Sequence, residues 1–233
     1  MADDDRTLPT ANATRNDVDA FLRKVAATPN LKQSGRRGRL MFAMDATASR
    51  QASWDKACQI QAEMFEATST LGGLDVQLVY YRGFRECQAS PWVGSAKDLL
   101  KRMTAVTCLG GQTQIGRVLK HALKESHREK VNAVVFVGDC MEEDIDDLCG
   151  RAGELALRKV PVFLFQEGSD QRAERAFRDI ARLTKGAYCS FDAGSAAQLK
   201  ALLSAVAVYA AGGRKALEAR KDSAAVRLLQ QLK

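Results

Sequence analysis

The chain has 233 residues, and its hydrophobic content of 46% suffices for the core of one sizeable α/β domain but not for two full domains. It opens Met-Ala-Asp-Asp-Asp-Arg, with no basic start followed by an apolar stretch, so we expect no secretory signal and a cytoplasmic location. The apolar run that ends at Ala211 is too short to span a bilayer, so we also expect no membrane association.

The formal net charge of +7 is concentrated in two segments, residues 31–40 and residues 212–233. The region between them is nearly neutral, which argues against a nucleic-acid face built into the main domain. Lysine and arginine tails can bind nucleic acid in a salt-sensitive manner. Neither interleaved aromatic residues nor a known nucleic-acid module accompanies them here, so we favour solvated tails or an acidic protein partner.

The cysteines and histidines do not indicate a zinc site. The six cysteines contain no Cys-x-x-Cys pair, and without an export signal we expect reduced thiols. The two histidines, His121 and His127, lie six residues apart on one predicted helix, so we interpret them as solvated or capping residues rather than zinc ligands.

Strands and helices alternate along most of the chain. Residues 1–13 are predicted to be disordered, residues 14–36 to form a short helix and a basic linker, and residues 212–233 to form a basic helix. Between them, residues 37–211 form the predicted main domain. Buried strands are predicted at residues 40–45, 74–81, 131–137, 160–165 and 187–191, and an antiparallel edge strand at residues 84–88. Amphipathic helices are predicted at residues 57–71, 95–103, 115–123, 142–155, 173–183 and 195–206.

Two of the buried strands end in an aspartate. Asp45 follows the first strand and Asp139 follows the fourth. In an open α/β sheet of order 3-2-1-4-5-6, strands one and four are neighbours where the strand order reverses, and ligands bind outside the carboxyl ends of such strands. The two carboxylates are therefore predicted to converge. Taken alone, Asp45 could equally cap a helix, and we interpret the acids at residues 142–144 as ordinary acids of a helix start.

Three hydroxyl side chains belong to loops next to these aspartates. Thr47 and Ser49 follow Asp45 at alternate positions, and Thr113 ends a glycine-rich turn, Leu-Gly-Gly-Gln-Thr. That turn lacks the Gly-Lys-Ser/Thr of a phosphate loop, so we exclude a nucleotide loop. Five oxygen groups around one point favour Mg²⁺ or Mn²⁺ over zinc.

These residues resemble the metal site of a von Willebrand factor A domain. The family's metal-ion-dependent adhesion site uses Asp-x-Ser-x-Ser, a threonine in a second loop and an aspartate in a third loop. The matching residues follow in the same order: Asp45, Thr47, Ser49, Thr113 and Asp139. The predicted hairpin edge strand and the Gly-Gly before the threonine are also similar to the family. The chain departs from the pattern at Thr47, where serine is usual, and at Ala48 and Cys140, where glycine is common.

The resemblance implies a Rossmann-like, doubly wound α/β fold with a mostly parallel six-stranded sheet and one antiparallel edge strand. It also implies a protein-binding module rather than an enzyme. In such a module Thr47, Ser49 and Thr113 are metal ligands, and Asp45 and Asp139 bind the metal directly or through water. One coordination position is left open for an aspartate or glutamate of a partner protein. Many cytosolic relatives are partners of ATPases or assembly complexes, so a complex of that class is the expected partner.

Two other interpretations stay open at this point. A haloacid-dehalogenase-like, Mg²⁺-dependent phosphatase would use Asp45 as nucleophile, with Asp139 and Asp144 in its acidic metal loop. Against it, Thr47 stands where that family usually places an acid, and the turn before Thr113 has no role. Alternatively, the fold is kept and the domain acts through its surface without a metal.

Overall fold

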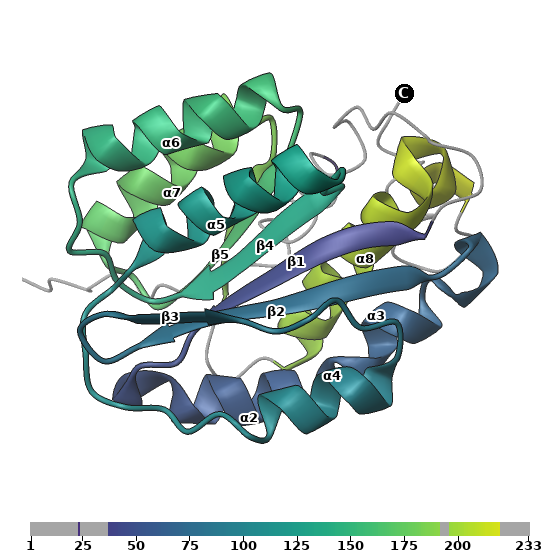
Figure 1. The fold of residues 1–233 in the computed structure, drawn as a ribbon, viewed down its shortest axis with the longest axis horizontal. Coiled ribbons are helices and arrows are strands. Elements are labelled where there is room, and N and C mark those ends of the chain that lie inside the picture. The colour runs from purple at the N-terminus through teal and green to yellow at the C-terminus, as the bar shows by residue number, and fades with distance from the viewer. Residues whose placement is uncertain (1–22, 24–36, 192–195, 220–233) are drawn as a thin grey trace, which may run out of the picture.

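The computed structural model describes residue 23, residues 37–191 and residues 196–219 (Figure 1). The predicted disorder of residues 1–13 lies outside these residues, as does most of the predicted helix and linker at residues 14–36, of which only Arg23 is described and is helical. Most of the predicted basic helix at residues 212–233 is also outside them. The domain boundaries proposed above therefore stay predictions.

The described residues alternate strands and helices as predicted. The strands are β1 (Gly38–Asp45), β2 (Leu74–Arg82), β3 (Glu86–Ala89), β4 (Ala133–Gly138), β5 (Val162–Glu167) and β6 (Ala187–Phe191). The helices are η1 (Ala48–Arg50), α2 (Gln51–Ile60), α3 (Ala62–Glu66), η2 (Ser69–Leu71), α4 (Ala96–Met103), α5 (Ile115–Arg128), α6 (Ile145–Leu157), α7 (Gln171–Leu183) and α8 (Ala196–Ala219).

The six strands form one sheet in the order β3-β2-β1-β4-β5-β6. All neighbours are parallel except β2 and β3, which form the antiparallel hairpin at one edge. At the centre of the sheet, Phe42 of β1 lies between Leu78 of β2 and Val135 of β4. The predicted fold class, strand order and antiparallel edge are thus confirmed.

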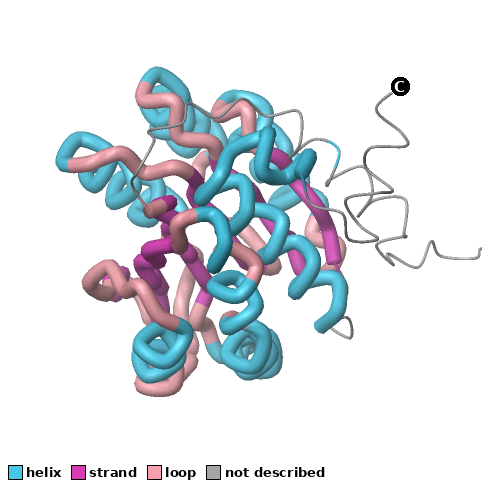
Figure 2. Tube along the Cα trace, turned by 90° about the vertical axis from the view of Figure 1, so that its right-hand side faces the viewer, coloured by secondary structure: helices cyan, strands magenta, loops and turns pink. Residues whose placement is uncertain are grey.

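Helices cover both faces of the sheet. Figure 1 shows α5, α6 and α7 on one face and α2, α3, α4 and α8 on the other, and Figure 2 shows the strands enclosed between helices from a second side. Residues of β1 alternate between the two cores: Leu40, Phe42 and Met44 join one cluster, and Met41 and Ala43 join the other. Because β1 is buried on both faces, its central part is apolar throughout. This apolar run is the pattern that predicted a buried strand from the sequence.

The predicted helix at residues 57–71 is divided in the structure into α2, α3 and η2. The Thr68 hydroxyl donates hydrogen bonds back to the carbonyls of Met64 and Phe65, at 3.0 and 3.1 Å, just before the chain tightens into η2. Such back-bonding competes with regular helical pairing. Gly72 and Gly73, with φ of 97° and 87°, then end the helical segment as predicted, because positive φ suits glycine.

The last helical segment, α8, is interrupted at Gly213, whose φ of 71° is not helical. Its window Ala196–Gly213 has a mean hydropathy of 1.2 and is long and apolar enough to cross a membrane by length and composition, so the length argument made from the sequence is wrong. However, 61% of this window is buried inside the fold. Its approach to β1 is close, since a Cβ on Gly38 would lie 2.5 Å from the Cα of Ala211. Packing on the sheet therefore accounts for its apolar character.

Candidate metal centre

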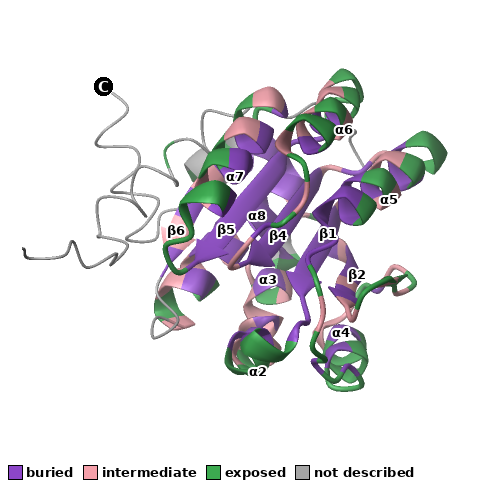
Figure 3. Cartoon of the chain, turned by 90° about the vertical axis from the view of Figure 1, so that its left-hand side faces the viewer, coloured by how far each residue is buried: buried purple, intermediate pink, exposed green. Residues whose placement is uncertain are grey.

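The candidate site lies where β1 and β4 end side by side. Met44 pairs with Val137, so Asp45 and Asp139 lie at the carboxyl ends of two adjacent strands. Figure 3 views the molecule with the ends of β1 and β4 toward the reader. Asp45 is fully buried, and burial is the main effect that raises the pKa of its carboxyl. The negative charge of Asp139 raises that pKa further, whereas the hydrogen bond from the Thr47 backbone lowers it. The two carboxylates are therefore close enough to repel, as their positions after neighbouring strands predicted.

The loop after β1 is organised by Asp45. The Thr47 backbone N–H donates to Asp45 Oδ1 at 2.7 Å, which turns the chain into η1. The hydroxyl oxygens of Thr47 and Ser49 lie 3.4 Å apart, and the Ser49 hydroxyl donates to Asp139 Oδ2 at 3.3 Å. Four of the five predicted ligands thus form one continuous chain of contacts. Asp45 does not cap α2, whose N-cap residue is Arg50.

Two buried carboxylate oxygens at this site have no hydrogen-bond partner among the described residues. They are Asp45 Oδ2 and Asp139 Oδ1. An unpaired buried carboxylate oxygen is unfavourable, because folding removes it from water without giving it a donor. A divalent cation that prefers oxygen ligands would satisfy both atoms, so the residues fit the metal that the sequence predicts.

Thr113 has different partners in the structure. Its backbone N–H donates to Glu142 Oε2 at 3.0 Å, and its Oγ1 accepts from the Glu142 backbone N–H at 3.1 Å. Within the described part of the chain, no hydrogen bond joins Thr113 to the other four predicted ligands. The structure therefore places Thr113 against the loop that follows Asp139, and its described hydrogen bonds are to that loop.

The interpretation of the three acids at residues 142–144 as one group of helix-start acids is wrong for two of them. Asp144 does cap α6, since its Oδ1 accepts from the backbone N–H of Asp146 at 2.8 Å. Glu142 binds Thr113, and Glu143 accepts from the backbone N–H of Gly116 at 2.9 Å and so stabilises the start of α5. The loop after β4 therefore holds the loop that carries Thr113.

Arg50 was not expected to belong to the site. Its side chain is 3% exposed, and its Nη1 forms an ion pair with Glu167 at the end of β5 and lies 3.9 Å from Asp139 Oδ2. The Ser53 hydroxyl also donates to Glu167. A buried guanidinium needs such counter-charges. The sequence signal was a basic residue directly after the second hydroxyl, but nothing in it indicated that the side chain turns inward.

The site stays negatively charged even with this arginine. Asp45, Asp139 and Glu167 lie around Arg50. Three carboxylates against one guanidinium leave an excess of negative charge. This excess favours the binding of a cation, independently of the orphaned oxygens.

Tyr81 is a second residue that the sequence did not assign to the site. It pairs with Asp45 in the register of β1 and β2 and is fully buried. Burial, and after it the charge of Asp45, raise the pKa of its hydroxyl well above the ordinary value. The phenol therefore stays protonated and can donate a hydrogen bond toward the centre.

The thiols and imidazoles do not form a metal site in the described residues. All six cysteines are free, and burial, together with the adjacent Asp139, raises the pKa of Cys140 to about 12. A thiol with such a pKa is not a thiolate at neutral pH and is a poor metal ligand. No group of three histidine, cysteine, aspartate or glutamate side chains that could hold a metal occurs in the described ranges, so the candidate centre depends on its hydroxyl donors.

No protein-family model and no curated protein sequence matches this chain. Solved structures do match it. A von Willebrand factor type A protein from Catenulispora acidiphila is 15% identical, with a TM-score of 0.61, over 73% of this chain and 42% of that one. The VWA domain of SpRpn10 is 15% identical, with a TM-score of 0.56, over 72% of this chain and 93% of that domain.

A third match is proximal thread matrix protein 1 from the mussel byssus, solved with a zinc-occupied MIDAS motif, where MIDAS denotes the metal-ion-dependent adhesion site. It is 17% identical, with a TM-score of 0.58, and the alignment covers 74% of this chain and 46% of that protein. Identities this low establish the fold alone. Together with the strand order and the antiparallel edge strand, they show that this protein has the fold of von Willebrand factor A domains.

Proposed function

We propose that this protein is a von Willebrand factor A-type interaction module that binds an aspartate or glutamate of a partner protein through a divalent cation. The observation that carries the proposal is the pair of buried, unpartnered oxygens, Asp45 Oδ2 and Asp139 Oδ1, at the ends of adjacent central strands. Structural neighbours with the same fold, one of them with an occupied metal site, support it.

Each proposed ligand has a distinct role. Asp45 and Asp139 supply negative charge, directly or through water, and Thr47, Ser49 and Thr113 supply neutral hydroxyl oxygens. Oxygen donors of this kind favour Mg²⁺ or Mn²⁺ for this chain. When bound, the cation would offer an electropositive coordination position to an incoming carboxylate, because three of its five protein donors are uncharged.

The partner is proposed to be a protein with an exposed acidic residue, such as a subunit of an ATPase or of an assembly complex. We propose a cytoplasmic location for this interaction. The basic segments at residues 31–40 and 212–233 are compatible with an acidic partner, and we do not assign them to nucleic acid.

A phosphatase with Asp45 as nucleophile is the alternative function. The burial of Asp45, at 0% exposure, argues against it, because a phosphate ester would have to reach that carboxylate. One of its two oxygens is also engaged by the Thr47 backbone. The same purified sample can test both functions.

Calorimetric titration with Mg²⁺ and with Mn²⁺ tests the proposal. We expect saturable binding to the wild-type protein, a loss of at least tenfold in affinity for Asp139→Asn, and weaker binding for Thr113→Ala. Asp144→Asn is the matched control, because Asp144 lies in the same loop but caps α6, and it should bind the metal as the wild type does.

Absence of saturable binding by the wild-type protein would overturn the metal-dependent function. A phosphatase assay on the same samples should show no turnover. Turnover that disappears in Asp45→Asn would instead establish the enzyme.

A further inference from the structure

Exposed apolar side chains lie next to the candidate metal centre. Among the described residues, the exposed large hydrophobic side chains are Phe84 at 73%, Leu157 at 85%, Leu109 at 46% and Leu100 at 37%. Leu109 belongs to the loop that precedes Thr113, and Phe84 to the turn between β2 and β3. The turn follows the carboxyl end of β2, and the loop connects α4 to α5.

Backbone contacts fix both residues relative to the site. The Leu109 N–H donates to the carbonyl of Ala46 at 3.0 Å, so Leu109 lies against the loop that begins at Asp45. Phe84 follows shortly after Tyr81, the register partner of Asp45. Leu109 therefore lies next to the loop of the centre, and Phe84 lies in the turn that follows β2, the strand next to β1.

The two loops are also joined to each other. The Gln112 N–H donates to the carbonyl of Gly83 at 3.1 Å, and the Gln114 side chain donates to the same oxygen at 3.2 Å. A Cβ on Gly111 would lie only 2.1 Å from that oxygen, which shows how closely the backbones approach. Because the hairpin turn is attached to the second loop, Phe84 and Leu109 form a fixed apolar surface that needs little ordering on binding.

Exposed charges of both signs lie near the hairpin turn and the start of α5. On the hairpin side, Arg85 and Arg117 are exposed and have no ion pair within the described ranges, and Arg117 Nη1 donates to the Arg85 carbonyl at 2.8 Å. The loop after β4 exposes Glu142 and Asp144, and Asp144 lines the same cavity as Arg117. Arg85 and Arg117 are therefore the exposed positive charges near the hairpin turn, and acids of a partner segment are attracted toward them.

We infer that this rim, formed by Phe84, Arg85, Leu109 and Arg117, selects a protein segment in which the metal-binding carboxylate has an apolar neighbour. The apolar side chain contacts Phe84 and Leu109, and further acids of the segment face the two arginines. The inference rests on the proposed function, because the carboxylate at the metal is what brings the segment to the rim. An apolar contact beside one charged contact is a common arrangement at the centre of protein interfaces.

A displayed library of random twelve-residue peptides tests the proposed function and this inference separately. The library is applied to the full chain in Mg²⁺, and the bound peptides are eluted with EDTA and sequenced. We expect the eluted peptides to share an aspartate or glutamate with an apolar residue next to it. With the double variant Phe84→Ser, Leu109→Ser, we expect the acid to be retained and the apolar preference to disappear.

The outcomes distinguish the inference from the function. Eluted peptides that share an acid without an apolar neighbour, or a double variant that keeps the apolar preference, would overturn the inference and leave the metal-dependent function in place. Eluted peptides without any shared acid would overturn the function, and the inference with it.

The Kd of one enriched peptide then measures how much the two apolar side chains contribute to binding. Its Kd should rise at least about tenfold in the double variant, since both apolar contacts are lost. Leu157→Ser is the matched control, because Leu157 is exposed but lies at the far end of α6 from the centre, and its Kd should stay within about twofold of wild type. The Mg²⁺ affinity should be the same in all three proteins, which excludes an effect on the metal site.

Discussion

Gly111 determines how closely the second loop can approach the β2–β3 turn. An added Cβ would lie 2.1 Å from the carbonyl oxygen of Gly83, whereas a Cβ on the adjacent Gly110 would meet nothing within 4 Å. We expect Gly111→Ala to displace the loop that carries Thr113. Its free energy of unfolding should fall by about 1–3 kcal/mol, as in other overpacked sites, and its Mg²⁺ affinity should fall as well.

Gly110→Ala is the control for this prediction, and its stability should change by no more than about 0.5 kcal/mol. Urea denaturation measures the stability, and calorimetry measures the metal affinity. Equal stability and equal affinity of the two variants would show that the second loop does not depend on this close approach.

The contacts of single residues were predictable only where the sheet alone determines them. Asp45 and Asp139 could be paired from the sequence because each follows a buried strand, and the two strands are neighbours in the sheet. Glu142 could not be separated from its acidic neighbours, because its contact with Thr113 depends on the path of two loops. The buried side chain of Arg50 forms an ion pair with Glu167, and the position of Glu167 depends on β5. The sequence around Arg50 therefore does not reveal this contact.

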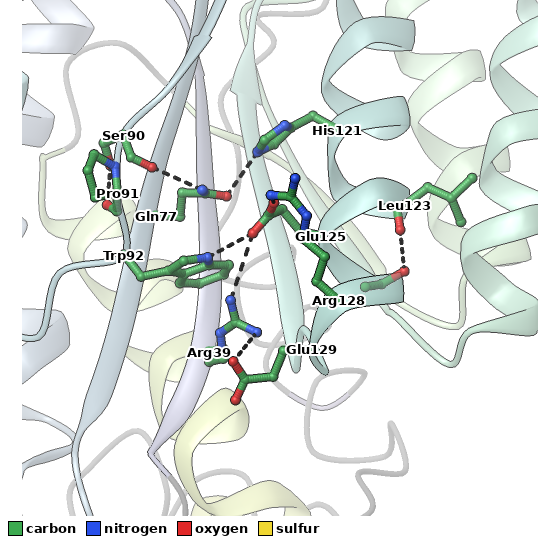
Figure 4. A network of polar contacts seen from close by, with 11 residues as sticks. Arg39, Gln77, Ser90, Pro91, Trp92, His121, Leu123, Glu125, Arg128 and Glu129 are labelled. Carbon is green, nitrogen blue, oxygen red and sulfur yellow. Dashed lines mark hydrogen bonds and ion pairs between the residues drawn. The ribbon is translucent and has the colours of Figure 1, made fainter.

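At the scale of the elements, α5 is fixed to the sheet by a polar network at its inner side (Figure 4). His121 Nε2 lies 3.0 Å from Gln77 Oε1, and the Trp92 indole N–H donates to Glu125 Oε2 at 3.0 Å. The Arg39 guanidinium lies 4.0 Å from the centre of the Trp92 ring. Three strand or loop segments therefore hold one helix, which in turn follows directly on Thr113.

This network makes stability depend on pH. Burial lowers the pKa of His121 from its ordinary value of 6.5, and the charges of Lys124 and Arg128 lower it further, although Glu125 opposes them. The unfolded chain therefore binds this proton more readily than the folded one. The stabilising contribution is complete above pH 6.5 and is lost as the pH falls below that value.

We accordingly expect protonation of His121 to reduce the free energy of unfolding between pH 7 and pH 5, so that over this range the wild type loses more stability than His121→Gln does. His127→Gln, which removes the exposed histidine of the same helix, is the control and should follow the wild type. Urea denaturation at the two pH values measures the difference. An identical pH dependence of His121→Gln and wild type would contradict this assignment.

The elements themselves were largely predictable, for a physical reason. β1, β4 and β5 are buried on both faces, so each contains a continuous apolar run that is bounded by polar residues. The division of the predicted helix at residues 57–71 was not predictable, because it depends on a hydroxyl contact at Thr68. The network around Trp92 joins partners from several elements, so no single periodic pattern reveals it.

At the scale of the whole molecule, the position of α8 depends on a close backbone approach at the start of β1. A Cβ on Gly38 would lie 2.5 Å from the Cα of Ala211 and 2.6 Å from the carbonyl oxygen of Ala210. These are backbone atoms and cannot move aside independently. Gly38→Ala should therefore lower the free energy of unfolding by about 1–3 kcal/mol.

Gly150→Ala is the opposite case, because its Cβ would meet nothing within 4 Å and the residue lies inside α6. Its stability should rise by about 0.5–1 kcal/mol, since alanine is the better helix former. Chemical denaturation of the two variants tests the pair. An unchanged stability of Gly38→Ala would mean that α8 does not approach β1 as described.

The central place of β1 in the sheet has a consequence for the growing chain. Asp45 is synthesised early, but its neighbour in the sheet, β4, follows only after β2, β3, α4 and α5. Until β4 arrives, one edge of β1 is unpaired and its apolar residues are open to wrong partners. Asp45 and Asp139 can meet only when that edge is closed. A partner that binds at this pair of aspartates would therefore bind only chains in which β4 has been synthesised and has paired with β1.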